Sequence, residues 1–324
     1  MTAIQPYLDG YTSHNRPDTA TFNFNGTLHR WSQATKSWYS VSAFLPRSFP
    51  PVIMTQWNAR DLLESPPPAR FHDIFTQNAF GDPSPSSGTN SLYATIGRLV
   101  NRPLPYNLDG YYELISRFAI AFNPVPEDPT LTVGNEADTV YLMRSYIVSP
   151  VCMVLGKSTQ YSISTKSEEN VSDGTTTCRV DLSFTVHFSA TASKTFAVME
   201  FKRPGSIKDE EWIPVLNANP MRSMGAGADV ICRQLHKYAA IRDTPYVGVC
   251  DGILLVMLRL AGTKESWKGS QPYQARPTEA EFWWIHDINE MKRNMFMWLY
   301  GALQQCMTNW HNNTLGDSIA YVPL

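Results

Sequence analysis

Alternation of apolar and polar residues is cleanest in residues 175–190, TTTCRVDLSFTVHFSA. The apolar positions are Val180, Leu182, Phe184, Val186 and Phe188, and the intervening polar ones are Asp181, Ser183, Thr185 and His187. Side chains alternate across a strand with a period of two, so this pattern predicts a β-strand. The next segment, residues 194–204 (KTFAVMEFKRP), starts with apolar residues on both faces. That pattern is typical of a central strand that is covered on both sides.

Helical patterns surround these two strands. Residues 135–156 have the spacing of a helix, with Asn135 as its N-cap, and residues 227–243 predict a second helix. Residues 246–260 predict one or two strands, and residues 278–310 predict a long helix or a helix pair. The expected order is helix, strand, strand, helix, strand or strands, helix, which indicates an α/β fold around a mixed sheet.

The first part of the chain is less regular. Two short β-like segments at residues 19–31 and 36–45 predict a hairpin region, with Asn25-Gly26 as a turn. Residues 46–108 are broken by proline clusters, which predict loops and short helices. We therefore expect an accessory region over residues 1–130, made of a hairpin, Pro-rich loops and short helices. The core and its C-terminal helices then occupy residues 131–324.

Composition limits the classes of protein that remain. The chain has 324 residues, of which 43% are hydrophobic and 17% are charged, and its net charge is −2. This content supports a real core and argues against disorder. The near-zero charge excludes a global basic field, so contact with nucleic acid requires a local basic surface.

The cysteines and the termini bear on the compartment. The five cysteines are scattered without a Cys-x-x-Cys pair, which indicates free thiols in a reducing environment. The first residues do not resemble a signal peptide, and no apolar run reaches the length of a membrane span. We expect a protein that is intracellular, cytoplasmic or nuclear, that is not secreted and that has no membrane partner.

The charges within the second strand need an explanation. Glu200 and Lys202 share one face of residues 194–204, and a buried charge without a partner costs several kcal/mol. A hairpin centred near residues 190–193 would place Asp181 roughly opposite Lys202 and diagonal to Glu200, with the register open by a residue or two. Two carboxylates beside an ammonium suit a divalent metal with a general base or charge stabiliser next to it. The alternative is an internal ion-pair cluster with a purely structural role.

The order of these residues resembles the PD-(D/E)xK nuclease superfamily. Asp181 stands for the Asp of the motif and Glu200-Phe201-Lys202 for the (D/E)xK part, while Val180 replaces the Pro. Gln234 and Tyr238 on the following helix resemble the Gln-x-x-x-Tyr motif of the RecB-like branch, and positions i and i+4 share one side of a helix. The resemblance implies a restriction-endonuclease-like core, in which helices flank a mixed central sheet.

The same resemblance implies roles for individual residues. Mg²⁺ or Mn²⁺ would be held by Asp181, Glu200 and the main-chain carbonyl of Phe201, and Glu136 would complete the metal site. Glu113 and Glu169 are weaker candidates for that last position. Lys202 and Gln234 would be catalytic: Lys202 would orient or deprotonate the attacking water, and Gln234 would position that water or a phosphate. The residues expected to bind substrate are Arg203, Lys237 and Tyr238.

The function implied is a metal-dependent nuclease that hydrolyses phosphodiester bonds of nucleic acid, with DNA favoured over RNA. Two alternatives stay open. One is a catalytically inactive protein of the PD-(D/E)xK fold that acts as a binding or interaction module. The other is a binding module in which the charged cluster only supports the structure.

Overall fold

The computed structural model describes residues 21–24, 27–32, 37–40, 56–68, 70–77, 92–102, 108–116, 119–121, 133, 135–172, 177–268 and 276–312. The chain divides into two compact units, Met1–Met54 and Thr55–Leu324. Within the first unit, β1 (Thr21–Phe24), β2 (Thr27–Ser32) and β3 (Ser37–Ser40) form an antiparallel sheet, as the sequence predicts. The predicted turn at Asn25-Gly26 lies outside the described residues.

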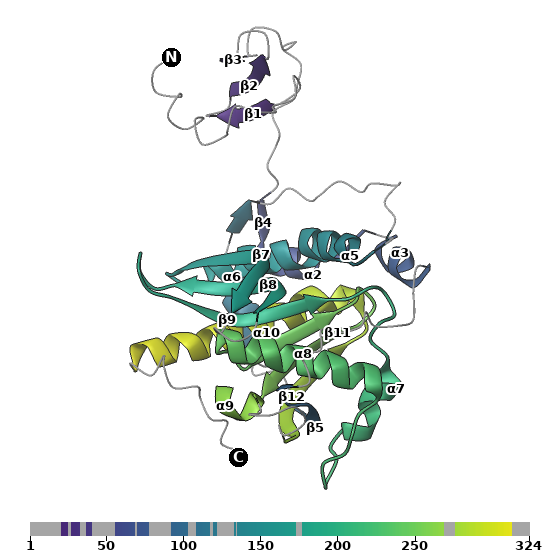
Figure 1. Cartoon of the computed structure of the whole chain (residues 1–324). Helices are drawn as coiled ribbons and strands as arrows, with labels where there is room; N and C mark the ends of the chain where they lie inside the picture. Colours follow the sequence, from purple (N-terminus) through teal and green to yellow (C-terminus); the bar gives the residue numbers. More distant parts are fainter. Residues whose placement is uncertain are drawn as a thin grey trace. The chain divides into compact units, whose positions relative to one another are not determined.

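The second unit is built on a seven-stranded mixed sheet (Figure 1). In spatial order its strands are β5 (Ile96–Asn101), β12 (Thr278–Ile285), β11 (Leu255–Leu260), β10 (Tyr246–Cys250), β9 (Ser193–Phe201), β8 (Thr177–His187) and β7 (Ser162–Ser172). Two neighbouring pairs, β9 with β10 and β5 with β12, run parallel, and the other pairs run antiparallel. Strands β4 (Gln56–Asn58) and β6 (Ala119–Ala121) pair with each other and form a separate two-stranded sheet.

Helices cover both faces of the large sheet. The first face packs against α2 (Ala59–Glu64), α6 (Ser149–Lys157) and α10 (Ile288–His311), and the second against α8 (Ala226–Arg242). The remaining helical segments are α3 (Phe71–Gln77), α4 (Leu108–Ile115), α5 (Glu136–Met143), η2 (Arg144–Val148), α7 (Asp209–Trp212), η3 (Ile213–Val215) and α9 (Lys264–Trp267). The α/β class that the sequence predicts is confirmed.

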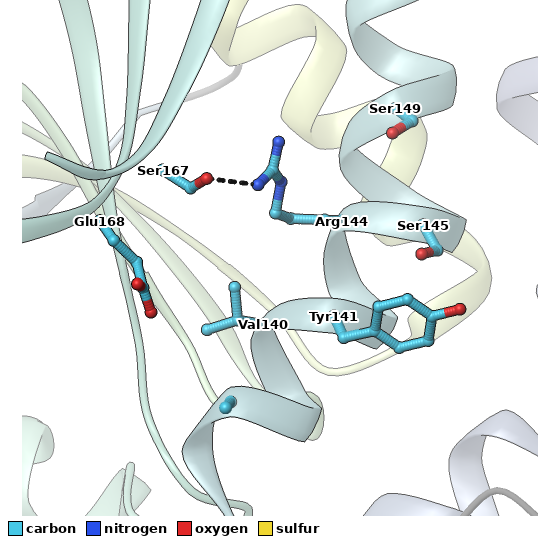
Figure 2. A pocket seen from close by; sticks show the side chains of 8 residues that line it. Val140, Tyr141, Arg144, Ser145, Ser149, Ser167 and Glu168 are labelled. Atoms are coloured by element: carbon cyan, nitrogen blue, oxygen red, sulfur yellow. Dashed lines mark hydrogen bonds between the residues drawn. The ribbon is translucent and has the colours of Figure 1, made fainter. Parts of the chain in front are cut away.

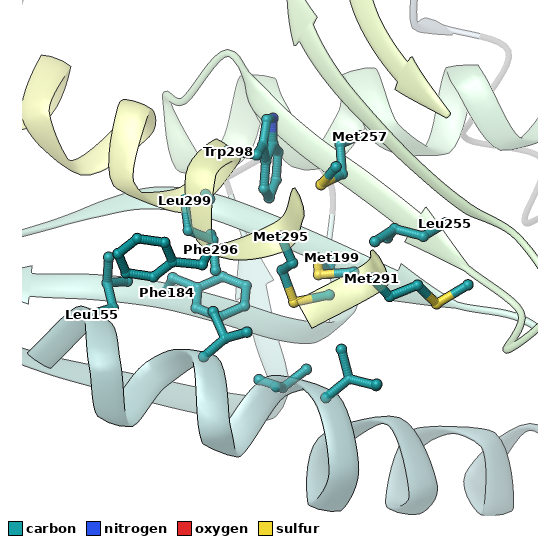
Figure 3. Packing of buried hydrophobic residues seen from close by; sticks show 14 of the residues in the cluster. Leu155, Phe184, Met199, Leu255, Met257, Met291, Met295, Phe296, Trp298 and Leu299 are labelled. Carbon is teal, nitrogen blue, oxygen red and sulfur yellow. The ribbon is translucent and has the colours of Figure 1, made fainter. Parts of the chain in front are cut away.

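Methionine and aromatic side chains fill the first face. Met291, Met295 and Trp298 of α10 are buried against Met199 of β9 and Met257 of β11 (Figure 3). The long thioether side chains suit an irregular gap between a helix and a twisted sheet. The side chains that β8 and β9 place on this face are apolar and buried. The polar side chains of the two strands lie on the opposite face of the sheet, toward α8.

The helical run that precedes β7 begins as the sequence predicts. The Asn135 side chain accepts from the main-chain N–H of Asp138, and the Asp138 carboxylate accepts from the N–H of Asn135, which completes a capping box. The run then continues through η2, a π-helical turn, into α6. Residues Glu136–Lys157 are long and apolar enough to cross a membrane by length and composition, but half of the most apolar stretch is buried inside the protein.

Three parts of the sheet differ from the sequence prediction. Thr278–Ile285 is strand β12, whereas the aromatic run there was predicted to begin the last helix; α10 begins only after Asp287, whose side chain accepts from the N–H of Asn289. Strand β7 was not predicted, because its residues are mostly polar and it lies at the edge of the sheet. Strand β5 lies inside the stretch 46–108 that was predicted to be loops and short helices.

The boundary between the two units also differs from the predicted one. We expected the core to start at residue 131, but the compact unit starts at Thr55. The physical reason is that β5 pairs with β12 and that Leu62 of α2 is fully buried in the same core as α10. The elements that the structure describes between residues 56 and 121 therefore share one compact unit with the strands and helices that follow them.

Candidate functional site

The polar residues of β8 and β9 meet at the ends of these two strands. Their ladder pairs Leu182 with Met199, so Asp181 lies opposite Glu200 and not opposite Lys202 as predicted. The offset arises because the turn is centred near residue 190: His187 pairs with Ser193, and the register shift between Phe184 and Thr185 then moves Asp181 by one residue, from opposite Met199 to opposite Glu200. Asp181, Glu200 and Lys202 thus come together as expected, although the residue opposite Asp181 is Glu200 and not Lys202.

Hydrogen bonds hold the acidic pair in place. Asp181 Oδ2 accepts from the main-chain N–H of Phe201 at 2.8 Å. Glu200 Oε1 accepts from the ammonium of Lys202 at 2.5 Å and from the side-chain amide of Gln234 at 2.6 Å. Asp181, Glu200 and Lys202 are only 5%, 3% and 6% exposed, which makes a buried charged cluster rather than a surface one.

Helix α8 supplies the second wall of this cluster. Gln234 donates to the hydroxyl of Tyr238 at 2.6 Å, and that hydroxyl donates to the main-chain carbonyl of Arg179 at 3.0 Å. Burial raises the pKa of Tyr238 well above its usual value, and the nearby Glu200 carboxylate raises it further. Tyr238 is therefore a neutral donor that ties the helix to the start of β8.

The cluster carries an excess of acidic groups. Burial and, after it, the neighbouring Glu200 raise the pKa of Asp181 to about 7, against the opposing effects of the Phe201 N–H and Lys202. Glu136, at the first position of α5, also has a raised pKa, mainly through burial. The charges of Lys202 and Asp181 act on Glu136, so the start of α5 belongs to the same site.

Lys202 is the cation among these acids. Burial alone lowers the pKa of its ammonium, but Glu200, then Glu136 and Asp181, outweigh that effect, and the net pKa is raised. Lys202 is consequently protonated at neutral pH. Its side chain acts as a fixed positive charge in the structure described here and not as a base.

The carboxylate oxygens of this cluster are of the type that binds a divalent ion. No group of three or more His, Cys, Asp or Glu side chains is placed to hold a metal among the residues that the structure describes. Two carboxylates do stand together, and Glu200 Oε2 is buried without a hydrogen-bond partner. A buried carboxylate oxygen with no donor is costly, and hard divalent cations favour oxygen ligands of this type. Asp181 and Glu200 are therefore the side chains that would hold such an ion.

Some predicted residues lie elsewhere or have other partners. Arg203 is exposed and close enough to lower the pKa of Glu136, so it lies at the edge of the site. Lys237 is only 2% exposed, which does not suit the predicted contact with a phosphate. Glu113 is exposed on α4. Glu169 accepts from Ser183 at 3.0 Å and pairs with Arg242, so it is engaged in fixing α8 to β7 and β8.

Two further residues were missed by the sequence analysis. Arg179 is exposed, shares the strand face of Asp181 and lowers the pKa of Glu136; its position two residues before Asp181 was the available signal. Asp251 is fully buried and accepts main-chain N–H groups of Ile207, Ile253 and Leu254 at 2.9 to 3.1 Å. It anchors the loop that follows Lys202, and no sequence pattern indicated this.

The fold and the site can be set against known proteins. The described residues form an α/β unit in which helices flank a seven-stranded mixed sheet. The site lies at the ends of two neighbouring strands and faces α8. Comparisons with models of protein families, with curated proteins and with solved structures find no match to this chain.

Proposed function

We propose that this protein is a Mg²⁺- or Mn²⁺-dependent nuclease that hydrolyses phosphodiester bonds of nucleic acid, with DNA favoured over RNA. The proposal includes a restriction-endonuclease-like core of the PD-(D/E)xK type. One observation carries it: Asp181, Glu200 and Lys202 are buried together, and Glu200 Oε2 has no hydrogen-bond partner. The amide of Gln234, bonded to the other oxygen of Glu200, is consistent with the same function.

The acidic groups explain why a cation would bind. Asp181 and Glu200 outnumber the single ammonium of Lys202, and Glu136 adds a third carboxyl group within electrostatic reach. A bound divalent ion would activate water and stabilise negative charge on the phosphate. Glu200 Oε1 is already occupied by Lys202 and Gln234, so Oε2 is the oxygen left to bind the ion.

Lys202 would stabilise the charge that develops on the reacting phosphate. Its ammonium is held by Glu200 at 2.5 Å, and its raised pKa keeps it protonated. A preorganised cation in a site that excludes water contributes most where negative charge grows in the transition state. Of the two roles expected for this lysine, the role of charge stabiliser is therefore favoured over that of base.

Arg179 and Arg203 would hold the substrate. Both guanidinium groups are exposed, and both act electrostatically on Glu136. Arginine binds phosphate oxygens in a planar, bidentate manner, so this pair provides the local basic surface that the near-zero net charge of the protein requires.

The test is cleavage of labelled linear, circular and single-stranded DNA and of RNA, each with Mg²⁺ or Mn²⁺ and with chelator. Asp181→Ala and Lys202→Ala should abolish cleavage, whereas Glu210→Gln and Lys157→Ala, which change exposed residues outside the site, should not. Equal activity in Lys202→Ala would overturn the proposal. Metal binding without cleavage of any substrate would leave the inactive, binding-module alternative.

A further inference from the structure

A groove lies between the helical run that starts at Glu136 and the edge strand β7. Its volume is about 400 Å³, which is within the range of small-ligand sites. The residues that line it are Ala137, Val140, Tyr141, Arg144, Ser145, Ser149, Ser167 and Glu168 (Figure 2). The cavity is thus bounded by the cation Arg144, the carboxylate of Glu168, the ring of Tyr141 and several hydroxyl groups.

Arg144 provides the recognition of an anion. One of its terminal nitrogens donates to Ser167 Oγ at 2.6 Å, as Figure 2 shows. Among the described residues it forms no ion pair, so the rest of its guanidinium remains available. Ser145 and Ser149 also line the groove, but Figure 2 shows them on the other side of the helix from the Arg144 guanidinium, so Ser167 is the hydroxyl that lies beside it. Arginine with serine hydroxyls is a typical set of phosphate contacts.

Tyr141 provides a surface for a base. It is 56% exposed, which sets it apart from the other large hydrophobic residues of this helical run, such as Leu142 and Ile147. An exposed ring beside a phosphate contact is the arrangement on which single-stranded bases stack. The combination of Tyr141 and Arg144 therefore matches a nucleotide better than an apolar ligand.

The groove adjoins the site of the proposed nuclease. In the β7–β8 ladder, Ser167 pairs with Leu182 and Glu169 with Val180, so Glu168 lies opposite Asp181. Arg144 follows Glu136 by eight residues on the same helical run, which is about 12 Å along a helix axis. That distance spans only a few nucleotides even at the rise of about 3.4 Å of stacked B-form DNA, and fewer in an extended single strand.

Two backbone irregularities coincide with the groove. Arg144 and Ser145 belong to η2, the π-helical turn, and such turns are rare and frequent at functional sites. Glu168 has a φ of 52°, which is uncommon for a residue other than glycine. The conformation of Glu168 costs free energy and is retained where the surrounding structure enforces it.

We propose that this groove is a subsite for a nucleotide that flanks the cleaved bond, with its base on Tyr141 and its phosphate on Arg144. The proposal rests on the nuclease function proposed above. The substrate class that follows is a single strand or a frayed end, because a base within a duplex cannot reach the ring of Tyr141.

The test measures binding of a fluorescent oligothymidylate that is long enough to span both sites. The full chain carries Lys202→Ala so that the oligonucleotide stays intact, Mn²⁺ is present, and anisotropy is recorded over a range of salt concentrations. Tyr141→Ala should weaken binding by roughly 5- to 100-fold, and Tyr141→Phe should preserve it because the ring remains. Arg144→Ala should weaken binding and reduce the salt slope by about 0.7, the value for one phosphate on a single strand.

Lys157→Ala is the matched control, since Lys157 is an exposed cation at the end of the same helical run and outside the groove. The proposal is overturned if both groove variants bind as tightly as their parent, or if the parent, shown by circular dichroism to be folded, does not bind. Cleavage by the chain with Lys202 intact is scored separately. If the chain with Lys202 intact cleaves but the groove variants bind as tightly as their parent, only the subsite proposal is refuted. If the groove variants weaken binding but the chain with Lys202 intact does not cleave, only the proposed nuclease function is refuted.

Discussion

Gln234 on helix α8 and Glu200 on strand β9 are joined by a hydrogen bond of 2.6 Å between the side-chain amide nitrogen and carboxylate Oε1. The same oxygen accepts from Lys202, so both donors lie on one side of the carboxylate. The other oxygen is buried and unpartnered. The helix and the lysine together determine which carboxylate oxygen is left to bind a ligand.

Removal of the Gln234 amide should therefore weaken metal binding without removing a metal ligand. We expect Gln234→Ala to lower Mn²⁺ affinity or activity by about 10- to 100-fold, as is common for residues that orient a ligand. Isothermal titration calorimetry provides the measurement, and Gln304→Ala on α10 is the matched control. Unchanged Mn²⁺ affinity in Gln234→Ala would show that the amide does not orient Glu200.

The buried ion pair predicts strong coupling between its partners. Lys202→Met leaves Glu200 charged at 3% exposure, and an uncompensated buried charge costs about 3–5 kcal/mol. Glu200→Gln combined with Lys202→Met should cost less than the sum of the two single changes. Urea denaturation without divalent ions measures the cycle, and strict additivity would contradict the pairing.

Much of this site follows from the sequence. The alternation in β8 placed Asp181 on the polar face, and the spacing of Gln234 and Tyr238 placed both on one side of α8. The exact partners did not follow, because the position of the turn between β8 and β9 and the one-residue bulge near Thr185 together set the register, and the sequence left both open. The raised pKa of Lys202 depends on carboxylates from other elements, which no local pattern reveals.

The fold was predicted where periodicity was strong. It was missed where tertiary contacts override local preference, as in β12, which is held as a strand by its pairing with β5 and β11. The edge strand β7 has an almost entirely polar sequence, and its pairing to β8 alone defines it. Sequence periodicity alone therefore does not predict either strand.

Two glycines should respond in opposite ways to the same substitution. A Cβ at Gly225 would lie 2.6 Å from Glu211 Cβ and 2.9 Å from Glu211 Cα, and the carboxylate of Glu211 accepts from Ala228 N–H at the start of α8. Gly225→Ala should lower the free energy of unfolding. A Cβ at Gly156, in α6, meets nothing within 4 Å, so Gly156→Ala should raise it by about 0.5–1 kcal/mol. Thermal and urea unfolding of both variants provide the measurement, and changes of the same sign would refute the packing at Gly225.

Lys292 predicts a pH dependence of stability. Its ammonium donates to Leu62 O and Ser65 Oγ at 3.0 and 2.6 Å, and burial lowers its pKa from 10.5 to about 8. Between these two pH values the unfolded chain binds more protons than the folded chain, so a rise in pH stabilises the fold. The gain should amount to about 1–3 kcal/mol.

Lys292→Met lacks this titration and serves as the reference. Urea unfolding of both proteins from neutral pH to about pH 10 should show a difference that grows in favour of the native chain. Parallel curves would mean that Lys292 keeps an ordinary pKa in the fold. A difference of opposite sign would mean that its pKa is raised.

The central claim is that Asp181 and Glu200 share one divalent ion. Crystals soaked in Mn²⁺ and measured at the manganese absorption edge test it most directly. The account predicts one anomalous peak between the two carboxylates, within about 2.0–2.6 Å of their oxygens and of the Phe201 carbonyl, and no peak in Asp181→Asn crystals. A saturating soak without a peak at this position, in crystals where no neighbouring molecule covers the site, would contradict it.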